Sequence, residues 1–227
     1  MDYFRLCLAT NKNVSAFSAT GGALSAVAGR ISYIFNLKGA SLSIDTACSS
    51  SLVSLHLAVS NLRMHRMPRA LNSGVNLTLL PDIPAMFQRA GMMSPEGRCK
   101  TLDATADGYV RGEAVVSALL QPLDNPSGQT AEGVSSWCVL VRGSAVNQGG
   151  RSSTLTAPNG PSQQDVLRNA LQDAGASPAS IFGLQMHGTG RTRSSSSFPF
   201  LHSVRTSSSL TSLILSYSSQ EPLWVIP

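Results

Sequence analysis

The sequence of 227 residues has no pair of cysteines at the spacing of a zinc or redox motif. Its four cysteines are Cys7, Cys48, Cys99 and Cys138, and their wide separation argues against both a structural zinc site and a disulfide framework. No apolar run approaches the roughly 20 residues that a membrane span needs, and the first ten residues lack the apolar core of a secretory signal. We therefore expect a cytoplasmic protein without a membrane span, although an organelle stays open.

Charge is also sparse, because Asp, Glu, Lys and Arg together make up 13% of the chain. The 17 Lys and Arg residues against 12 Asp and Glu residues give a formal net charge of +5. The densest basic stretch, R-M-H-R-M-P-R at residues 63–69, has no interleaved aromatic residues and contains a Pro that stops a helix. Cations at a helix C-terminus complement the helix dipole, so the stretch predicts a solvated helix end rather than a nucleic-acid site.

The most informative stretch is residues 40–60, which read A-S-L-S-I-D-T-A-C-S-S-S-L-V-S-L-H-L-A-V-S. At its start, apolar and serine residues alternate, which predicts a short strand over 40–44. Further on, apolar residues recur at spacings of three and four, which predicts a helix. The apolar residues of that helix are Leu52, Leu55, Val59 and Leu62. Cys48 is therefore expected where a strand turns into a helix.

That position gives Cys48 two possible roles. The positive end of a helix dipole favours thiolate over thiol, and the first N–H groups of a helix can stabilise an oxyanion on a carbonyl that the sulfur attacks. Most cysteines without a disulfide, however, are small buried hydrophobes. From the residues alone, both a nucleophile and an inert buried thiol stay open.

A second chemical group is His187, which a predicted strand from residue 181 delivers into the turn H-G-T-G at 187–190. Its imidazole could project into a cavity, or it could be hydrogen-bonded within the turn. The other histidines are weaker candidates: His56 lies on the helix after Cys48, His65 in the basic stretch and His202 near the C-terminus.

Residues 103–113, D-A-T-A-D-G-Y-V-R-G-E, contain several charged groups in a Gly-rich stretch. Two of the three carboxylates of Asp103, Asp107 and Glu113 could form a pair for acid–base work. We favour a structural interpretation, because Asp side chains in such turns commonly accept hydrogen bonds from nearby backbone N–H groups.

Helical and strand patterns alternate along the rest of the chain, which indicates an α/β class with layers. Gly175 is expected to cap the last predicted helix. The predicted helices cover 20–35 and 163–174, the predicted strands 69–77, 114–120 and 137–145, and a Gly and Pro loop covers 87–98.

The segment S-I-D-T-A-C-S-S-S-L-V-S-L-H-L-A closely resembles the active-site segment of β-ketoacyl synthase domains of type I polyketide synthases and animal-type fatty acid synthases, a branch of the thiolase-like superfamily. Three further phrases resemble the family in the same order along the chain. They are G-x-x-x-S-x-x-A-x-R-I-S-Y at 21–33, D-x-x-A-D-G-Y-x-x-G-E at 103–113 and T-A-P-N-G-P-S at 156–162. H-G-T-G at 187–190 resembles the family's E-A-H-G-T-G-T, with Gln185 and Met186 in place of Glu and Ala.

The resemblance implies a thiolase-like, layered αβαβα fold that is incomplete here. It implies that Cys48 takes an acyl group and that His187 donates a hydrogen bond to the enolate of a malonyl unit in a decarboxylative Claisen condensation. The implied pocket-shaping residues are Thr46, Ala47, Ser49, Asp107 and Thr189. No metal or directly bound cofactor is implied.

The resemblance also implies partners. An acyl carrier protein would deliver the acyl and malonyl groups on phosphopantetheine, and a complete synthase would be a homodimer. Two alternatives stay open: a catalytically dead fragment that retains dimerisation or carrier docking, and a Cys-His hydrolase of unrelated fold, for which no protease signature surrounds Cys48. The residues leave the acyl substrate open, and they leave open whether the product is a polyketide or a fatty acid.

The resemblance ends after residue 190, where the chain reads R-T-R followed by four serines in place of the family's T-x-x-G-D-P-x-E. A later Lys and a second His in an N-I-G-H phrase are also missing. We expect a partial β-ketoacyl synthase domain over 1–190, truncated at both ends. We expect a Ser-rich tail over 191–227 that is disordered or poorly packed and derives from a frameshift, a mispredicted exon or an unrelated splice.

Overall fold

The computed structural model describes residues 2–10, 15–101, 103–123, 139–153, 159–181, 183–185, 187–189, 213–214 and 223–225. The helices are α1 (Asp2–Ala9), α2 (Ala16–Gly22), α3 (Leu24–Ile34), α4 (Ser50–Arg63), α5 (Asp82–Arg89) and α6 (Gly160–Ala174), with 3₁₀ turns η1 (Ala47–Ser49) and η2 (Pro178–Ser180). The strands are β1 (Ala70–Asn76), β2 (Ala114–Leu120), β3 (Gly143–Ala145), β4 (Leu184–Gln185), β5 (Leu213–Ile214) and β6 (Leu223–Val225).

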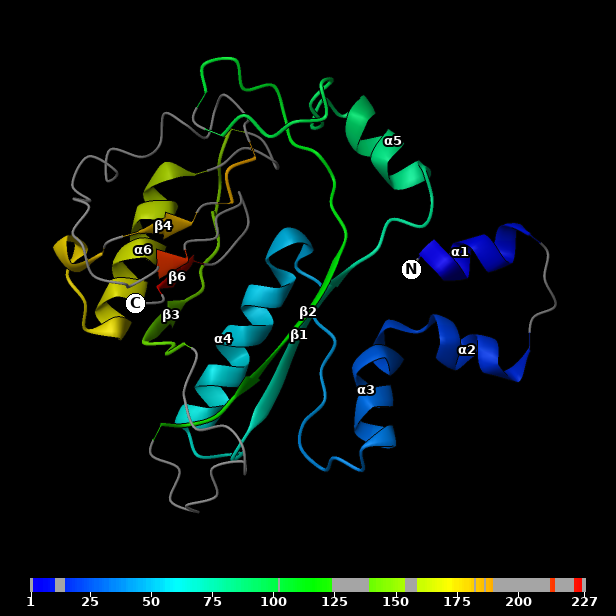
Figure 1. Ribbon diagram of the computed structural model, residues 1–227, viewed down its shortest axis with the longest axis horizontal. Helices are drawn as coiled ribbons and strands as arrows, with labels where there is room; N and C mark the ends of the chain where they lie inside the picture. The colour runs from blue at the N-terminus through cyan, green and yellow to red at the C-terminus, as the bar shows by residue number, and fades with distance from the viewer. Residues whose placement is uncertain are drawn as a thin grey trace.

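Helix α4 lies between two groups of elements (Figure 1). On one side β1 and β2 pair antiparallel along their whole length, from Ala70 opposite Leu120 to Asn76 opposite Ala114. On the other side lies α6 with the short strands β3, β4 and β6. The first and second halves of the chain therefore meet at α4.

The hydrophobic core of the described residues surrounds α6. One face of this helix repeats apolar residues at helical spacing, and each Val or Leu that it buries stabilises the fold by about 1.5–3 kcal/mol. The Asn159 side chain caps the helix by accepting a hydrogen bond from the Ser162 N–H, and Gly175 ends it at φ 59°, as predicted. The core residues are Ala145, Val166, Leu167, Ala170, Leu171, Ala174 and Ile181.

Several expectations from the sequence are confirmed. Strand β2 has the predicted bounds, β1 lies within the predicted strand at 69–77, and α6 contains the predicted helix at 163–174. The predicted strand at 137–145 is confirmed only over β3, since its first two residues lie outside the described residues and 139–142 are not a strand. The predicted loop at 87–98 begins later than expected, because α5 extends to Arg89.

Two expectations are wrong. The single helix over 20–35 is two helices, because Ala23 has extended backbone angles (φ −79°, ψ 128°) directly after the weak helix formers Gly21 and Gly22. The strand over 40–44 is not formed. A strand satisfies its backbone groups by pairing, and in the described part of the chain no strand pairs with residues 40–44.

Five residues of the segment 191–227 are described, and all five lie in strands. Strand β5 pairs parallel with β4, and β6 pairs antiparallel with β3, with Trp224 opposite Ser144. The other residues of this segment lie outside the described residues, so their expected disorder stays a prediction. The domain boundary at residue 190 also stays a prediction.

We predict that Gly143→Ala lowers the free energy of unfolding by about 1–3 kcal/mol, the usual cost of overpacking. A Cβ atom at Gly143 would lie 2.5 Å from the Ala174 nitrogen and 2.6 Å from the Ala170 oxygen, and these backbone atoms of α6 cannot move aside. Urea unfolding followed by circular dichroism measures the change. The control is Gly112→Ala, where an added Cβ meets no atom within 4 Å. Equal stability of the two variants would contradict the close packing of β3 on α6.

Candidate active site

Cys48 is the middle residue of the 3₁₀ turn η1, which leads directly into α4. Its position at the start of a helix is confirmed. The thiol-bearing residue is exposed, so the alternative of a cysteine buried as a small hydrophobe is wrong. The side chain is therefore accessible to a reactant at the positive end of a helix of 14 residues.

The backbone turns sharply at Ala47, which has φ 58° in the left-handed region. This conformation costs a residue with a Cβ about 1–2 kcal/mol. Two local hydrogen bonds hold it: the Ala47 N–H donates to Asp45 Oδ1 at 3.1 Å, and the Ser50 hydroxyl donates to the Ala47 oxygen at 2.6 Å. The strained residue thus lies immediately before Cys48, as at many functional sites.

Thr46 and Ser49 stabilise the same turn, Thr46 as an exposed residue and Ser49 as a buried one. Ser49 is completely buried, its hydroxyl lies 2.6 Å from that of Thr46, and it donates to the Thr46 oxygen at 2.8 Å. The Thr46 N–H donates to Ser50 Oγ at 2.9 Å. The backbone N–H groups of Thr46 and Ala47 are therefore bound to side chains of the turn itself.

Strand β1 holds the first half of α4. The Ser54 hydroxyl donates to Asn72 Oδ1, and Asn72 Nδ2 donates to the Ser51 oxygen at 3.3 Å. Gly74 allows the close approach, because a Cβ there would lie 2.9 Å from Ser51 Cβ. The turn that carries Cys48 is thereby fixed relative to the β1–β2 sheet.

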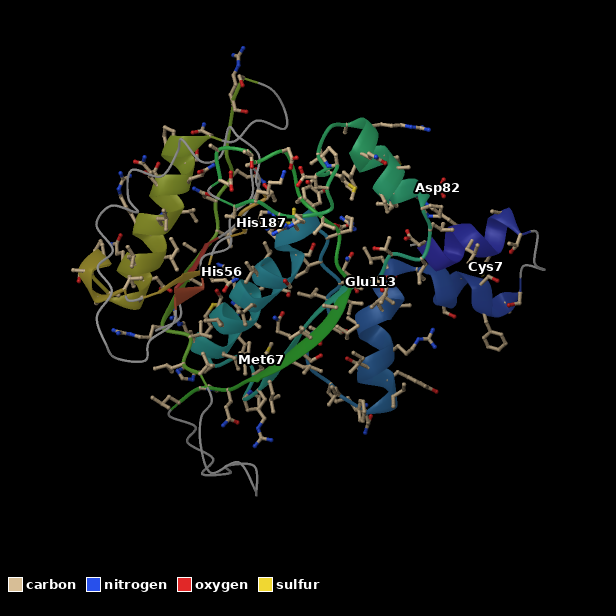
Figure 2. The ribbon with its side chains drawn as sticks, turned by 45° about the horizontal axis from the view of Figure 1, so that its top comes forward. Cys7, His56, Met67, Asp82, Glu113 and His187 are labelled. Atoms are coloured by element: carbon tan, nitrogen blue, oxygen red, sulfur yellow. The ribbon has the colours of Figure 1, made fainter. Side chains whose placement is uncertain are left out.

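His187 lies near the N-terminal end of α4 in Figure 2, and Figure 1 draws the segment that carries it toward the same end. The next residue, Gly188, has φ 35°, and its oxygen accepts a hydrogen bond from the Thr101 hydroxyl. A Cβ at Gly188 would collide with Thr101 Cγ2. Thr189 is half-buried beside this turn, whereas Met186 and Gly190 lie outside the described residues. The fold thus brings the predicted histidine toward the end of α4 that carries Cys48.

Asp107 forms an ion pair with Lys100, whose Nζ lies 3.0 Å from Asp107 Oδ2 and 3.2 Å from Glu96 Oε2. The hydrogen bond from Lys100 lowers the pKa of Asp107, and the same bond raises the pKa of Lys100. Lys100 directly precedes Thr101, which contacts the His187 turn. Asp107 therefore anchors the loop beside that turn.

The other carboxylates of this segment have structural contacts. Asp103 accepts hydrogen bonds from the Thr105 N–H at 2.7 Å and the Thr105 hydroxyl at 2.8 Å, and the backbone bond is the main cause that lowers the pKa of Asp103. Glu113 accepts a hydrogen bond from the Thr78 N–H at 2.5 Å. These contacts support the structural interpretation over the acid–base one.

The sequence did not reveal a cluster that joins α4 to the second half of the chain. His56 Nδ1 lies 2.9 Å from Ser144 Oγ on β3, and Asp173 Oδ2 on α6 accepts from the Ser144 N–H at 2.8 Å. Arg63 Nη1 lies 2.9 and 2.8 Å from the two Asp173 oxygens, and Arg63 Nη2 donates to the Arg142 oxygen at 2.7 Å. The sequence showed Arg63 only as part of a basic helix end, because its acceptor is 110 positions away.

This cluster is not a catalytic Ser-His-Asp triad. Ser144 is buried, with 6% of its surface exposed, and Asp173 binds the Ser144 amide and Arg63. Burial lowers the pKa of His56, although the nearby Asp173 carboxylate raises it in part. Burial favours the neutral form of Asp173, yet the hydrogen bonds from Arg63 and the Ser144 N–H hold its pKa below the ordinary value.

Metal ligands and membrane spans are absent from the described part of the chain. No group of three or more His, Cys, Asp or Glu side chains there could hold a metal ion. Among the same residues, no helix has the length and apolar character to cross a bilayer.

Family models match most of the chain. Residues 2–125 match the model "Beta-ketoacyl synthase, N-terminal domain", and residues 138–194 match "Beta-ketoacyl synthase, C-terminal domain". The second match continues four residues past position 190, where the sequence resemblance ended.

Curated relatives are much longer than this chain. It is 43% identical over 189 residues to one of the phenolphthiocerol/phthiocerol polyketide synthase proteins of Mycobacterium tuberculosis, covering 83% of this chain and 12% of that protein. It is 46% identical over 178 residues to a second protein of the same synthase and species, covering 78% of this chain and 8% of that protein. The chain thus spans about a tenth of the length of these relatives.

Solved structures agree with the fold expected from the sequence. The ketosynthase from module 6 of the bacillaene synthase of Bacillus subtilis 168 is 34% identical with a TM-score of 0.75, and covers 92% of this chain and 38% of its own. The oxazolomycin ketosynthase domain of Streptomyces albus is 29% identical with a TM-score of 0.76, and the coverage is 97% and 37%. The predicted α/β, thiolase-like class is confirmed, and the fold is incomplete relative to these domains.

We predict that acidification destabilises the protein through His56. Because the folded state lowers the pKa of His56, the unfolded state binds this proton more readily, and the free energy of unfolding falls as the pH drops through about 6.5. Urea unfolding at pH 7.5 and pH 5.5 should show a smaller pH dependence in His56→Asn than in the unchanged protein. The control His65→Asn replaces an exposed histidine at φ 53°, which Asn tolerates, and should retain the original dependence. An unchanged dependence in His56→Asn would refute the prediction.

Proposed function

The chain belongs to the β-ketoacyl synthase family, and from this premise we propose that Cys48 is its acyl-accepting nucleophile. The observation that carries the proposal is the position of Cys48, an exposed residue in the strained turn directly before α4. The polyketide synthase names of the relatives favour polyketide over fatty acid biosynthesis. The reaction is the decarboxylative Claisen condensation of an acyl thioester with a malonyl thioester.

In the loading step, the Cys48 thiolate attacks the carbonyl carbon of an acyl thioester on the phosphopantetheine of an acyl carrier protein. A new C–S bond forms to Cys48, the bond to the carrier sulfur breaks, and the carrier thiolate takes up a proton. The helix dipole at the start of α4 stabilises the attacking thiolate. Thr46, Ala47 and Ser49 fix the direction of the thiol through the hydrogen bonds within the turn.

In the condensing step, the malonyl thioester loses carbon dioxide, and its carbanion attacks the Cys48 thioester and releases the Cys48 sulfur. His187 donates a hydrogen bond to the thioester oxygen as enolate charge develops, which is an electrostatic stabilisation. The Thr101 contact at Gly188 orients the turn that holds His187. Thr189 lines the same turn, and Asp107 supports its neighbour loop through Lys100.

The family role gives the expected partners and setting. An acyl carrier protein delivers both substrates, the complete synthase is a homodimer, and the site acts in the cytoplasm. The domain occupies residues 1–190, and no directly bound cofactor takes part. A fragment that retains only dimerisation or carrier docking is the alternative, and its signature is carrier binding without acylation.

We predict that incubation with an acyl-loaded carrier protein adds one acyl mass to the chain, located on Cys48 by peptide mass spectrometry. Cys48→Ala should abolish the adduct, because Cys48 is the one thiol among the described residues that lies at a helix N-terminus. The matched control is Cys99→Ala, which removes another exposed cysteine and should load normally. Absence of loading on the unchanged chain, or equal loading on Cys48→Ala, would rule out the proposed nucleophile.

A further inference from the structure

The cluster of His56, Arg63, Ser144 and Asp173 joins the two halves of the chain through α4. His56 and Arg63 lie seven positions apart on α4 and so share a face of the helix. Both reach the second half: His56 meets Ser144 on β3, and Arg63 meets Asp173 on α6. Figure 2 shows His56 on the side of α4 toward β3 and β6.

Asp173 is the centre of this cluster. One of its oxygens accepts from the Ser144 N–H at 2.8 Å, and the carboxylate accepts Arg63 Nη1 through both oxygens. The other guanidinium nitrogen of Arg63 donates to the Arg142 oxygen beside β3. The planar fork of Arg serves two acceptors at once, which a single Lys ammonium does not reproduce. One carboxylate therefore joins α4, β3 and α6.

The opposite side of α4 is held differently. Asn72 and Gly74 of β1 contact Ser51 and Ser54, which restrains the first half of the helix relative to the first sheet. His56 and Arg63 restrain its middle and its C-terminal end relative to the part of the chain that also carries His187. The rotation and tilt of a helix about 21 Å long therefore depend on both sets of contacts.

We propose that His56, Arg63, Ser144 and Asp173 form a positioning latch that sets Cys48 relative to the half of the chain that carries His187. The inference rests on the proposed function of Cys48 and deepens it. These are positioning residues, because their contacts join α4 to β3 and α6. They act through α4, whose N-terminal turn presents the nucleophile.

Because the ion pair between Arg63 and Asp173 is partly exposed, a positioning role can be distinguished from a contribution to stability. The side chains of Arg63 and Asp173 are 44% and 35% exposed, and ion pairs of this kind add little to stability because water screens them. Loss of the pair should therefore change the placement of α4 more than the fraction of folded protein. A lower loading rate with an unchanged final extent of loading is the expected signature.

The test measures the rate of Cys48 loading at saturating acyl carrier protein in Asp173→Asn and Arg63→Lys. Asp173→Asn should slow loading at least about tenfold without lowering its final extent, since small misplacements of reacting groups cost large factors in rate. Arg63→Lys keeps the charge but loses the second donor to Arg142, so its rate should be intermediate. The control is Asp165→Asn, which lies on α6 like Asp173. The Asp165 carboxylate pairs with Arg168 of the same helix at 2.7 Å, so this variant should load at the original rate.

A second measurement keeps this inference separate from the proposed function. Iodoacetamide alkylates Cys48 and the exposed Cys99 in the same chain without any acyl donor, so the ratio of the two rates monitors the Cys48 environment alone. Asp173→Asn should change this ratio about threefold or more, because thiol reactivity follows the local electrostatic environment. If the unchanged chain is not acylated but Asp173→Asn still shifts the ratio of alkylation rates, the proposed function is rejected and the latch is retained. The latch would be overturned if Asp173→Asn kept the original loading rate and the original ratio of alkylation rates. It would also be overturned if Asp165→Asn changed them as much as Asp173→Asn does.

Discussion

The attachment of α4 on both sides is the constraint on which the candidate site depends. On one side the Asn72 amide and the close approach at Gly74 tie the helix to β1. On the other side the Asp173 carboxylate ties it to β3 and α6. A helix that contacts both halves can carry a reactive group at its end and keep that group in register with residues from either half.

Stability and chemistry lie in different places in this chain. The largest cluster of buried apolar residues in the described part lies around α6, and α4 buries Val59 and Leu62 toward its C-terminal end, whereas Cys48 is exposed in a turn that contains a left-handed Ala47. The strain of about 1–2 kcal/mol at Ala47 is of the same size as the gain from one or two hydrogen bonds. The bonds from the Ala47 N–H and the Ser50 hydroxyl meet that requirement locally.

Local patterns in the sequence predicted local features. The spacing of apolar residues predicted α6 and the helix after Cys48, and the β2 strand has the predicted bounds. The pattern failed at residues 40–44, because alternation shows which residues suit a strand and says nothing about whether a partner strand is present.

Non-local features were invisible for a related reason. Arg63 and Asp173 are 110 positions apart, and no rule of spacing pairs them. The seven-residue spacing of His56 and Arg63 was the available signal, since it placed the two ionisable side chains of α4 on one face of the helix. The approach of His187 to the end of α4 was likewise expected only through resemblance, because the fold alone brings these segments together.

The most direct measurement of the central claim joins Cys48 to position 187 by chemical crosslinking. The protein with His187→Cys is treated with a short bifunctional thiol reagent, and the crosslinked peptides are identified by mass spectrometry. The account predicts a crosslink between Cys48 and position 187 in the monomeric chain, formed faster than any crosslink from position 187 to Cys99. If both thiols react with a monofunctional reagent and yet no such crosslink forms, Cys48 and His187 do not share a site.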